Sequence, residues 1–167
     1  AGPYEKNKEY TRQTEELKKL FSDAKAYSET GNPEEKNLRF EAIKKLLNGT
    51  EITYIHSNDV KEMIEAVNFC KSFNLKKVVI VGGRESWMLT DLLKENNISV
   101  MVTRVHELPE HADDDIDQSF KLPYLLQKAG VLFCLNNAGD QEATGARNLP
   151  FLAGTTVAYG LTKEQAL

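Results

Sequence analysis

Val78-Val79-Ile80-Val81-Gly82-Gly83-Arg84 is the stretch that decides the fold. It starts with four consecutive β-branched apolar residues, runs into a glycine pair and is followed by a pattern typical of a helix. A strand that is apolar on both faces belongs in a parallel sheet, either covered by helices on both sides or closed into a barrel. The fold class indicated is therefore α/β.

Three further runs have the same character, namely Ile52–Ile55, Val100–Val102 and Val131–Leu135. Each is followed by a turn and then by apolar residues at helical spacing. Asn58 or Asp59 is suited to cap the first of these helices, whose apolar stripe consists of Val60, Met63, Ile64, Val67, Cys70 and Phe73. The sequence predicts four parallel βα units over residues 51–167.

The preceding segment, residues 1–50, has the pattern of two amphipathic helices, Glu5–Ser28 and Glu34–Leu47. Pro33 suits the first helical position of the second one. The predicted apolar stripe of the second helix consists of Leu38, Ala42, Ile43 and Leu46. We interpret this N-terminal helical segment as scaffold.

The last third of the βα region predicts two more helices, Leu122–Ala129, which Gly130 ends, and Asn148–Gly160. Thr162-Lys163-Glu164-Gln165 has the form of a capping box, which normally opens a helix. Because only two residues follow it, we expect the sequence to be a piece of a longer chain, truncated at both ends.

Composition excludes several classes of function. Lys and Arg number 21 and Asp and Glu 25, so the net charge is −4 and a general nucleic-acid-binding surface is not expected. No apolar run approaches the roughly 20 residues that cross a bilayer, and the first residues lack the apolar core of a signal peptide. The compartment cannot be read from the sequence. Cys70 and Cys134 lie in apolar patterns and are interpreted as packing residues.

Three stretches resemble the metal-dependent amidohydrolases, in the branch related to imidazolonepropionase. They are Ile52-Thr53-Tyr54-Ile55-His56-Ser57, the Val78–Arg84 stretch, and Thr144-Gly145-Ala146-Arg147-Asn148-Leu149-Pro150-Phe151 with the following Ala153-Gly154-Thr155. The resemblance runs from about residue 51 to the end of the chain. It implies a (β/α)8 TIM barrel, of which the four predicted strands correspond to the fifth to eighth, a half barrel.

The resemblance also implies site residues. His56 lies where the family's fifth strand ends in a metal-binding histidine, whereas Gly82-Gly83 stands where the sixth strand ends in another. Asn137 takes the place of an aspartate that binds metal and acts as the base, a role that a neutral amide cannot fill. The parent is expected to hydrolyse C–N bonds of amides or cyclic amides with zinc. This chain alone is expected to be inactive and to bind no zinc.

Two other classes of function stay open, a catalytically silent binding or scaffolding domain and an anion- or nucleotide-binding α/β domain. The second rests on Gly82-Gly83-Arg84, whose backbone amides could cradle an anion beside the Arg84 side chain. Arg147 is a candidate for contacting a substrate or bracing a loop. Residues 107–117 carry six carboxylates without a Lys or Arg, and a solvated acidic loop is favoured over a cation site.

A half barrel also predicts something about partners. It leaves two sheet edges unpaired and exposes side chains that would fill a barrel interior. The expected partner is the remainder of the parent barrel or a second copy of the chain in a homodimer. As an alternative, the N-terminal helices cover the open face.

Overall fold

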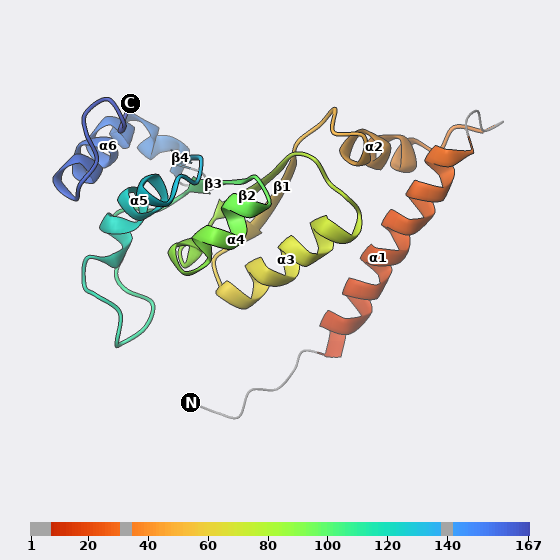
Figure 1. Ribbon diagram of the computed structural model, residues 1–167, viewed down its shortest axis with the longest axis horizontal. Coiled ribbons are helices and arrows are strands. Elements are labelled where there is room, and N and C mark those ends of the chain that lie inside the picture. Colours follow the sequence, from red (N-terminus) through yellow and green to blue (C-terminus); the bar gives the residue numbers. More distant parts are fainter. Residues whose placement is uncertain (1–7, 31–34, 138–141) are drawn as a thin grey trace. The chain divides into compact units, whose positions relative to one another are not determined.

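The computed structural model describes residues 8–30, 35–137 and 142–167, and the chain divides into two compact units (Figure 1). The first consists of Ala1–Glu51 together with Phe73–Lys76. The second consists of Ile52–Ser72 together with Lys77–Leu167 and contains the whole sheet.

The first unit contains the helices α1 (Lys8–Glu29) and α2 (Leu38–Leu47). Helix α2 begins later than predicted, because Asn37 caps it: its Oδ1 accepts the amide protons of Arg39 at 3.1 Å and Phe40 at 3.3 Å. The predicted start at Pro33 and Glu34 lies outside the described residues, and positions 35–37 are not helical.

The apolar core of this unit is small. Phe21, Ala24 and Ile43 are buried, and the ring centroids of Phe21 and Phe73 lie 5.2 Å apart. The prediction that Leu38 belongs to the buried stripe is wrong, since it is 82% exposed. Ala42 of the same predicted stripe is exposed as well, whereas Ile43 is buried and Leu46 is half-buried.

The second unit is built on four parallel strands, β1 (Thr53–Ser57), β2 (Val78–Gly82), β3 (Ile98–Val102) and β4 (Phe133–Leu135). They lie side by side in chain order, which confirms the predicted parallel βα repeats. Because every crossover advances in the same direction and crossovers of this kind are right-handed, the connecting helices fall on one face of the sheet. This is the winding of a barrel and not of a doubly wound sheet.

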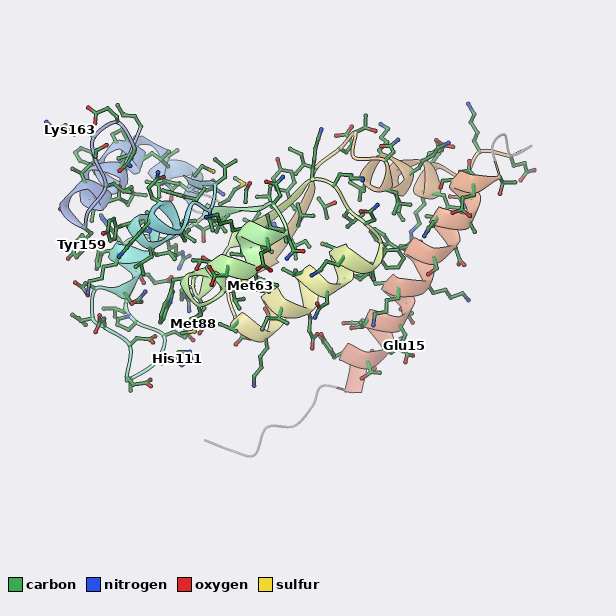
Figure 2. The ribbon with its side chains drawn as sticks, in the orientation of Figure 1. Glu15, Met63, Met88, His111, Tyr159 and Lys163 are labelled. Atoms are coloured by element: carbon green, nitrogen blue, oxygen red, sulfur yellow. The ribbon has the colours of Figure 1, made fainter. Side chains whose placement is uncertain are left out.

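The connecting elements are α3 (Val60–Ser72), the 3₁₀ helix η1 (Ser86–Leu89), α4 (Thr90–Glu95) and α5 (Gln118–Ala129). Helix α3 packs on β1, α4 on β3 and α5 on β4. The core lies between the helices and the sheet and includes the completely buried Met63 of α3, which Figure 2 labels. Its largest buried members are Met63, Ile80, Leu93, Leu122, Leu126, Val67, Val100 and Val102.

The opposite face of the sheet is open along its edges: Tyr54 on β1 is 54% exposed, and His56 and Cys134 are exposed as well. The apolar character of β2 on both faces therefore corresponds to helices on one side and to the inner side of a half-barrel layer on the other. The fold is α/β and resembles half of a TIM barrel.

The C-terminal part follows the predicted pattern with shifted boundaries. Helix α5 begins at Gln118, four residues before the predicted start, and ends at Gly130, whose φ of +76° is the left-handed conformation that glycine tolerates. The 3₁₀ helix η2 (Glu142–Asn148) leads into α6 (Leu149–Ala158), which confirms the second predicted helix.

The predicted capping box is present. The Thr162 amide donates to Gln165 Oε1 at 2.9 Å, and the Gln165 amide donates to Thr162 Oγ1 at 3.2 Å. Among the described residues, no helix has both the length and the apolar character needed to cross a membrane.

Candidate functional site

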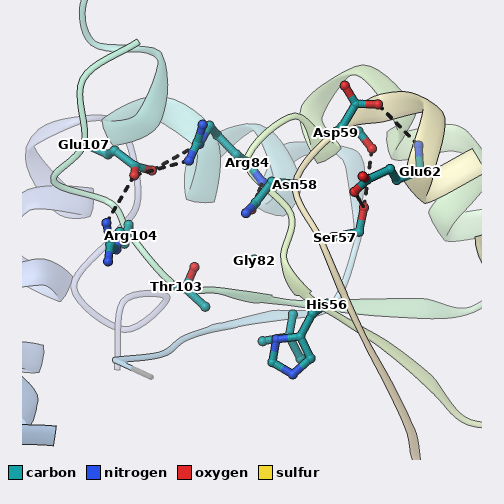
Figure 3. A pocket seen from close by; sticks show the side chains of 11 residues that line it. His56, Ser57, Asn58, Asp59, Glu62, Gly82, Arg84, Thr103, Arg104 and Glu107 are labelled. Atoms are coloured by element: carbon teal, nitrogen blue, oxygen red, sulfur yellow. Dashed lines mark hydrogen bonds and ion pairs between the residues drawn. The ribbon is translucent and has the colours of Figure 1, made fainter. Parts of the chain in front are cut away.

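A cavity of about 610 Å³ lies where the carboxyl ends of β1, β2 and β3 meet (Figure 3). In parallel α/β folds this edge is where ligands bind, because the loops that follow the strands converge there. Most of the lining residues have polar side chains, among them His56, Asn58, Glu62, Arg84, Thr103 and Glu107. Two of the four site residues predicted from the sequence, His56 and Arg84, belong to this lining.

His56 is the fourth residue of β1, and its side chain is exposed on the sheet face opposite the helices. The strand register places it in one row with Val81 of β2, Met101 of β3 and Cys134 of β4. In Figure 3 its ring lies below Thr103 and Gly82. Its ring therefore forms part of the cavity wall.

The glycine pair at the end of β2 is required by close packing against the segment after β1 and against β3. A Cβ on Gly82 would lie 2.5 Å from Asn58 Oδ1, and one on Gly83 would lie 2.6 Å from Val100 Cγ1. Both residues also have positive φ, of 104° and 64°. The pair therefore lets the end of β2 approach Asn58 and Val100 more closely than residues with side chains could.

The amides of this loop are used within the protein. Gly83 N–H donates to the Ser57 carbonyl at 2.8 Å, Arg84 N–H to Asn58 Oδ1 at 3.3 Å and Glu85 N–H to the Asn58 carbonyl at 3.2 Å. Since these donors face the β1 loop, they do not form a nest for phosphate. The geometry disfavours the nucleotide-binding alternative.

The Arg84 side chain is held by carboxylates of the chain itself. Its Nε lies 3.1 Å from Glu107 Oε2, its second terminal nitrogen lies 3.3 Å from Glu107 Oε1, and it also pairs with Glu110. Arg104 approaches the same Glu107 at 3.6 Å. Glu107 thus lies between two guanidinium groups at the rim of the cavity, as Figure 3 shows, in the two-point geometry that favours Arg–carboxylate pairs.

The first turn of α3 begins beside this cavity, and its free amides are satisfied by two carboxylates. Asp59 Oδ1 accepts from the amides of Lys61 at 2.7 Å and Glu62 at 3.3 Å, so Asp59 and not Asn58 is the cap. Glu85 Oε2 accepts from the Val60 amide at 2.8 Å. Negative charge at the positive end of the helix dipole is favourable.

Glu85 also links this helix to the segment that follows β3. Its Oε1 lies 2.7 Å from His111 Nε2, and its side chain is only 12% exposed (Figure 2 labels His111). The hydrogen bond to Glu85 raises the pKa of His111, and the Coulombic attraction of Asp114, Glu85 and Asp113 adds to the rise. The contact fastens the acidic segment to the loop after β2.

The acidic segment, residues 107–117, is tied to basic groups elsewhere in its unit. Lys121 of α5 contacts Asp115 at 3.1 Å and Asp117 at 2.6 Å, and these hydrogen bonds raise the pKa of Lys121. Asp114 accepts from the backbone amide of His111 at 3.0 Å. Together with the pairs of Arg84, these contacts use most of the carboxylates for holding the loop in place.

The other two predicted site residues are outside the cavity lining. Asn137 follows β4, and its side-chain amide lies close to Gly145, where an added Cβ would be 3.0 Å from Nδ2. Arg147 is exposed in η2. The fold therefore does not bring Asn137 and Arg147 together with His56 around this cavity.

Sequence reasoning missed Glu85, Thr103 and Arg104. The signal for Thr103 and Arg104 was their position directly after a predicted strand, where side chains reach the catalytic edge of parallel folds. For Glu85 no local pattern exists, because both of its partners are distant in sequence.

The side chains that the structure describes around the cavity do not include a complete set of donors for a divalent metal. The described residues contain no group of three or more His, Cys, Asp or Glu side chains that could hold a metal ion. His56 supplies one imidazole, but the neighbouring strand end is Gly82, which has no side-chain donor. Catalytic zinc takes three protein ligands, so one strand-end histidine is insufficient.

Comparison with protein-family models and with curated proteins finds no match for this chain. Among solved structures, an amidohydrolase from Thermotoga maritima MSB8 is similar, with a TM-score of 0.75 and 19% sequence identity. The fold is amidohydrolase-like. The match covers 90% of this chain and 40% of that chain, so this sequence spans well under half of the amidohydrolase's length. At 19% sequence identity, the similarity between the two chains is a similarity of fold.

Proposed function

We propose that this chain is the strand-five-to-eight half of a protein in the imidazolonepropionase-related branch of the amidohydrolases, and that by itself it binds a small polar ligand without hydrolysing it. The supporting observation is the cavity at the carboxyl ends of β1 to β3, which has the location of a barrel active site. The amidohydrolase-like fold over most of the chain supports the same assignment.

The chemistry of the lining favours binding over catalysis. Hydrolysis of an amide by activated water needs a group that polarises the carbonyl and a base that takes the proton. The carboxylates around the cavity already have other roles. Glu107 pairs with Arg84 and Arg104, Asp59 caps α3, and Glu62 accepts from the Ser57 hydroxyl at 3.3 Å.

The proposal is tested by assays of amide hydrolysis and of zinc content on the purified chain. We expect no hydrolysis of linear or cyclic amides with or without added Zn²⁺, and we expect less than one bound zinc ion per chain after dialysis. Asn137→Asp is expected to leave the chain inactive, because a carboxylate there adds one donor and not a complete ligand set.

His56→Ala and His106→Ala form a matched pair of variants for this test. His106 hydrogen-bonds to Thr155 at 2.8 Å and does not line the cavity. One zinc per chain that is lost in His56→Ala and kept in His106→Ala would contradict the proposal. So would measurable turnover by the unmodified chain.

For the longer protein we propose a metal-dependent hydrolase of C–N bonds. The favouring observation is His56, an exposed residue of the cavity lining that could ligate a metal held otherwise by residues outside this chain. Zinc there would activate water and polarise the carbonyl. Measuring the zinc content of the purified longer protein, with and without His56→Ala, tests the assignment.

A further inference from the structure

Two arginines at the cavity share one carboxylate, which comes from the loop after β3. Arg84 donates to Glu107 at two points, from Nε to Oε2 at 3.1 Å and from Nη2 to Oε1 at 3.3 Å. Arg104 Nη1 lies 3.6 Å from the same Oε1. Figure 3 shows the carboxylate between both guanidinium groups. Paired contacts of this kind are how arginine recognises the carboxylate of a ligand.

These three side chains also line the cavity. Arg84, Arg104 and Glu107 all belong to the lining of its roughly 610 Å³ volume, which lies in the usual range for small-molecule sites. The Arg84 and Glu107 side chains are only 26% and 22% exposed, whereas Arg104 is 60% exposed. The arginines therefore have the position of a ligand site, and a carboxylate of the chain itself occupies it.

The acidic segment that supplies Glu107 has no apolar anchor. None of residues 107–117 is buried, and its largest apolar side chains, Leu108 and Ile116, are 78% and 75% exposed. The nearest buried residues are Val105 before the segment and Ser119 after it. Segments with few buried apolar contacts open locally at a small cost in free energy. Opening of the acidic segment between these two anchors would leave the core in place.

Polar contacts hold the acidic segment, and solvent reaches several of them. Three of its ion pairs have an exposed partner within the segment, namely Glu110, His111 and Asp115. Solvent-exposed ion pairs contribute little to stability, because water and salt screen them. These contacts position the segment without fixing it as a packed core would.

We propose that Arg84 and Arg104 form a binding site for the carboxylate of a small organic acid, and that Glu107 occupies this site until such an acid displaces it. The inference rests on the ligand-binding function proposed above for the same cavity. A carboxylate is favoured over phosphate, because the group already bound is a carboxylate. The amides of the loop after β2, which would cradle a phosphate, donate within the protein.

Displacement is a competition between a tethered carboxylate and a free one. A group tethered by a short loop has an effective concentration of about 1 mM or more, so the wild type should bind a free acid weakly. Glu107→Gln keeps the shape of the side chain and removes its charge. We expect this variant to bind the acid at least about tenfold more tightly, because the competing carboxylate is gone.

Binding of succinate, a dicarboxylate, and of its neutral diamide succinamide to the purified chain tests the site. NMR titration of the Nε–H signals of Arg84 and Arg104 gives the affinities. We expect Glu107→Gln to increase the affinity for succinate and not for succinamide. Glu51→Gln is the matched control, since Glu51 has the same charge and pairs with Lys45 outside the cavity lining. It should bind succinate as the wild type does.

A second variant tests the role of Arg104. Glu107→Gln combined with Arg104→Gln should lose most of the gain in succinate affinity, because one of the two guanidinium groups is missing. Retention of the full gain would contradict a site made by both arginines. Circular dichroism of each variant shows that it is folded before affinities are compared.

The fluorescence of Trp87 reports displacement in the wild type. Trp87 is the only tryptophan of the sequence and lines a small cavity together with Pro109 and Glu110 of the acidic segment. Saturating succinate should change its emission, since the segment moves away when Glu107 leaves the arginines. Succinamide should leave the emission unchanged. Succinate binding without any change in emission would contradict displacement of the segment.

The outcomes separate this inference from the proposed function. Equal succinate affinity in wild type and Glu107→Gln would overturn the inference, as would tighter binding of inorganic phosphate than of succinate to that variant. Tighter binding of succinamide than of succinate would also overturn it, while a polar ligand in the cavity would still agree with the proposed function. A tenfold gain for succinate together with ammonia release from succinamide would confirm the inference and contradict the proposed absence of hydrolysis.

Discussion

Replacing Glu85 with alanine should destabilise the second unit, because this one carboxylate connects three segments. One oxygen accepts from the Val60 amide at the start of α3, and the other contacts His111. Glu85 itself lies in the loop after β2 and is buried. Alanine leaves the Val60 amide at a helix terminus without its acceptor.

The expected magnitude comes from the hydrogen bond to Val60. A hydrogen bond to a charged group contributes about 1.5–3 kcal/mol when one partner is removed, so we expect a loss of about 2 kcal/mol in the free energy of unfolding. For a chain of this size that corresponds to a fall in Tm of about 4–8 °C. The contact with His111 is not included, because the imidazole is exposed and solvent screens it.

Urea denaturation followed by circular dichroism is the assay, and Glu110→Ala is the matched control. Glu110 also pairs with Arg84, but its side chain is 54% exposed. Surface ion pairs contribute about 0–1 kcal/mol, so the control should move the midpoint only slightly. Glu85→Gln keeps an acceptor for the Val60 amide without the charge and should recover part of the loss. Equal midpoints for Glu85→Ala and Glu110→Ala would refute the reasoning.

The remaining predictions concern pH, backbone strain and thiol reactivity. Glu85 raises the pKa of His111 in the folded chain. The contact of His111 with Glu85 therefore stabilises the fold fully below the pKa of about 6.5 that histidine has in the unfolded chain, and this stabilisation is lost as the pH rises through the folded pKa. We expect the difference in urea midpoint between wild type and His111→Gln to shrink at higher pH. Gly83 has a φ of 64°, and an added Cβ would contact β3, so Gly83→Ala should lower the free energy of unfolding by more than about 1 kcal/mol. Gly154 lies in α6, where an added Cβ meets nothing within 4 Å, so Gly154→Ala should raise it by about 0.5–1 kcal/mol. Burial raises the pKa of Cys70 to about 11, so Cys70 should react with a thiol reagent only when the chain unfolds; rapid labelling of the native protein at Cys70 would contradict its burial.

Local patterns predicted the elements of the second unit well, because strand and helix periodicity depends on neighbouring residues. The four apolar runs became β1 to β4, and the glycine after α5 ended that helix. The boundaries were less accurate. Asn37 moved the start of α2, since a side chain that caps two amides outweighs the preference of proline for a first helical position.

The candidate site could be predicted only in part. His56 was predicted from the resemblance to the amidohydrolases and Arg84 from its place after the glycine pair, and the structure places both at the cavity. What Arg84 does there was not readable, since its partners Glu107 and Glu110 come from a segment more than 20 residues away. Asn137 and Arg147 followed from resemblance to a motif, and they lie apart from the cavity lining.

The sequence by itself determined the parallel α/β class, the order of its elements and the two helices that precede them, because all of these follow from residue spacing and from the hand of βα crossovers. Only the tertiary structure decided which polar groups are engaged. Asn58 and Asp59 are equally good caps by composition, yet Asp59 caps α3 while Asn58 accepts from the Arg84 amide. The physical reason is that hydrogen bonds and ion pairs need distances of a few ångströms. Residues that are far apart in the sequence reach such distances only when the sheet has formed.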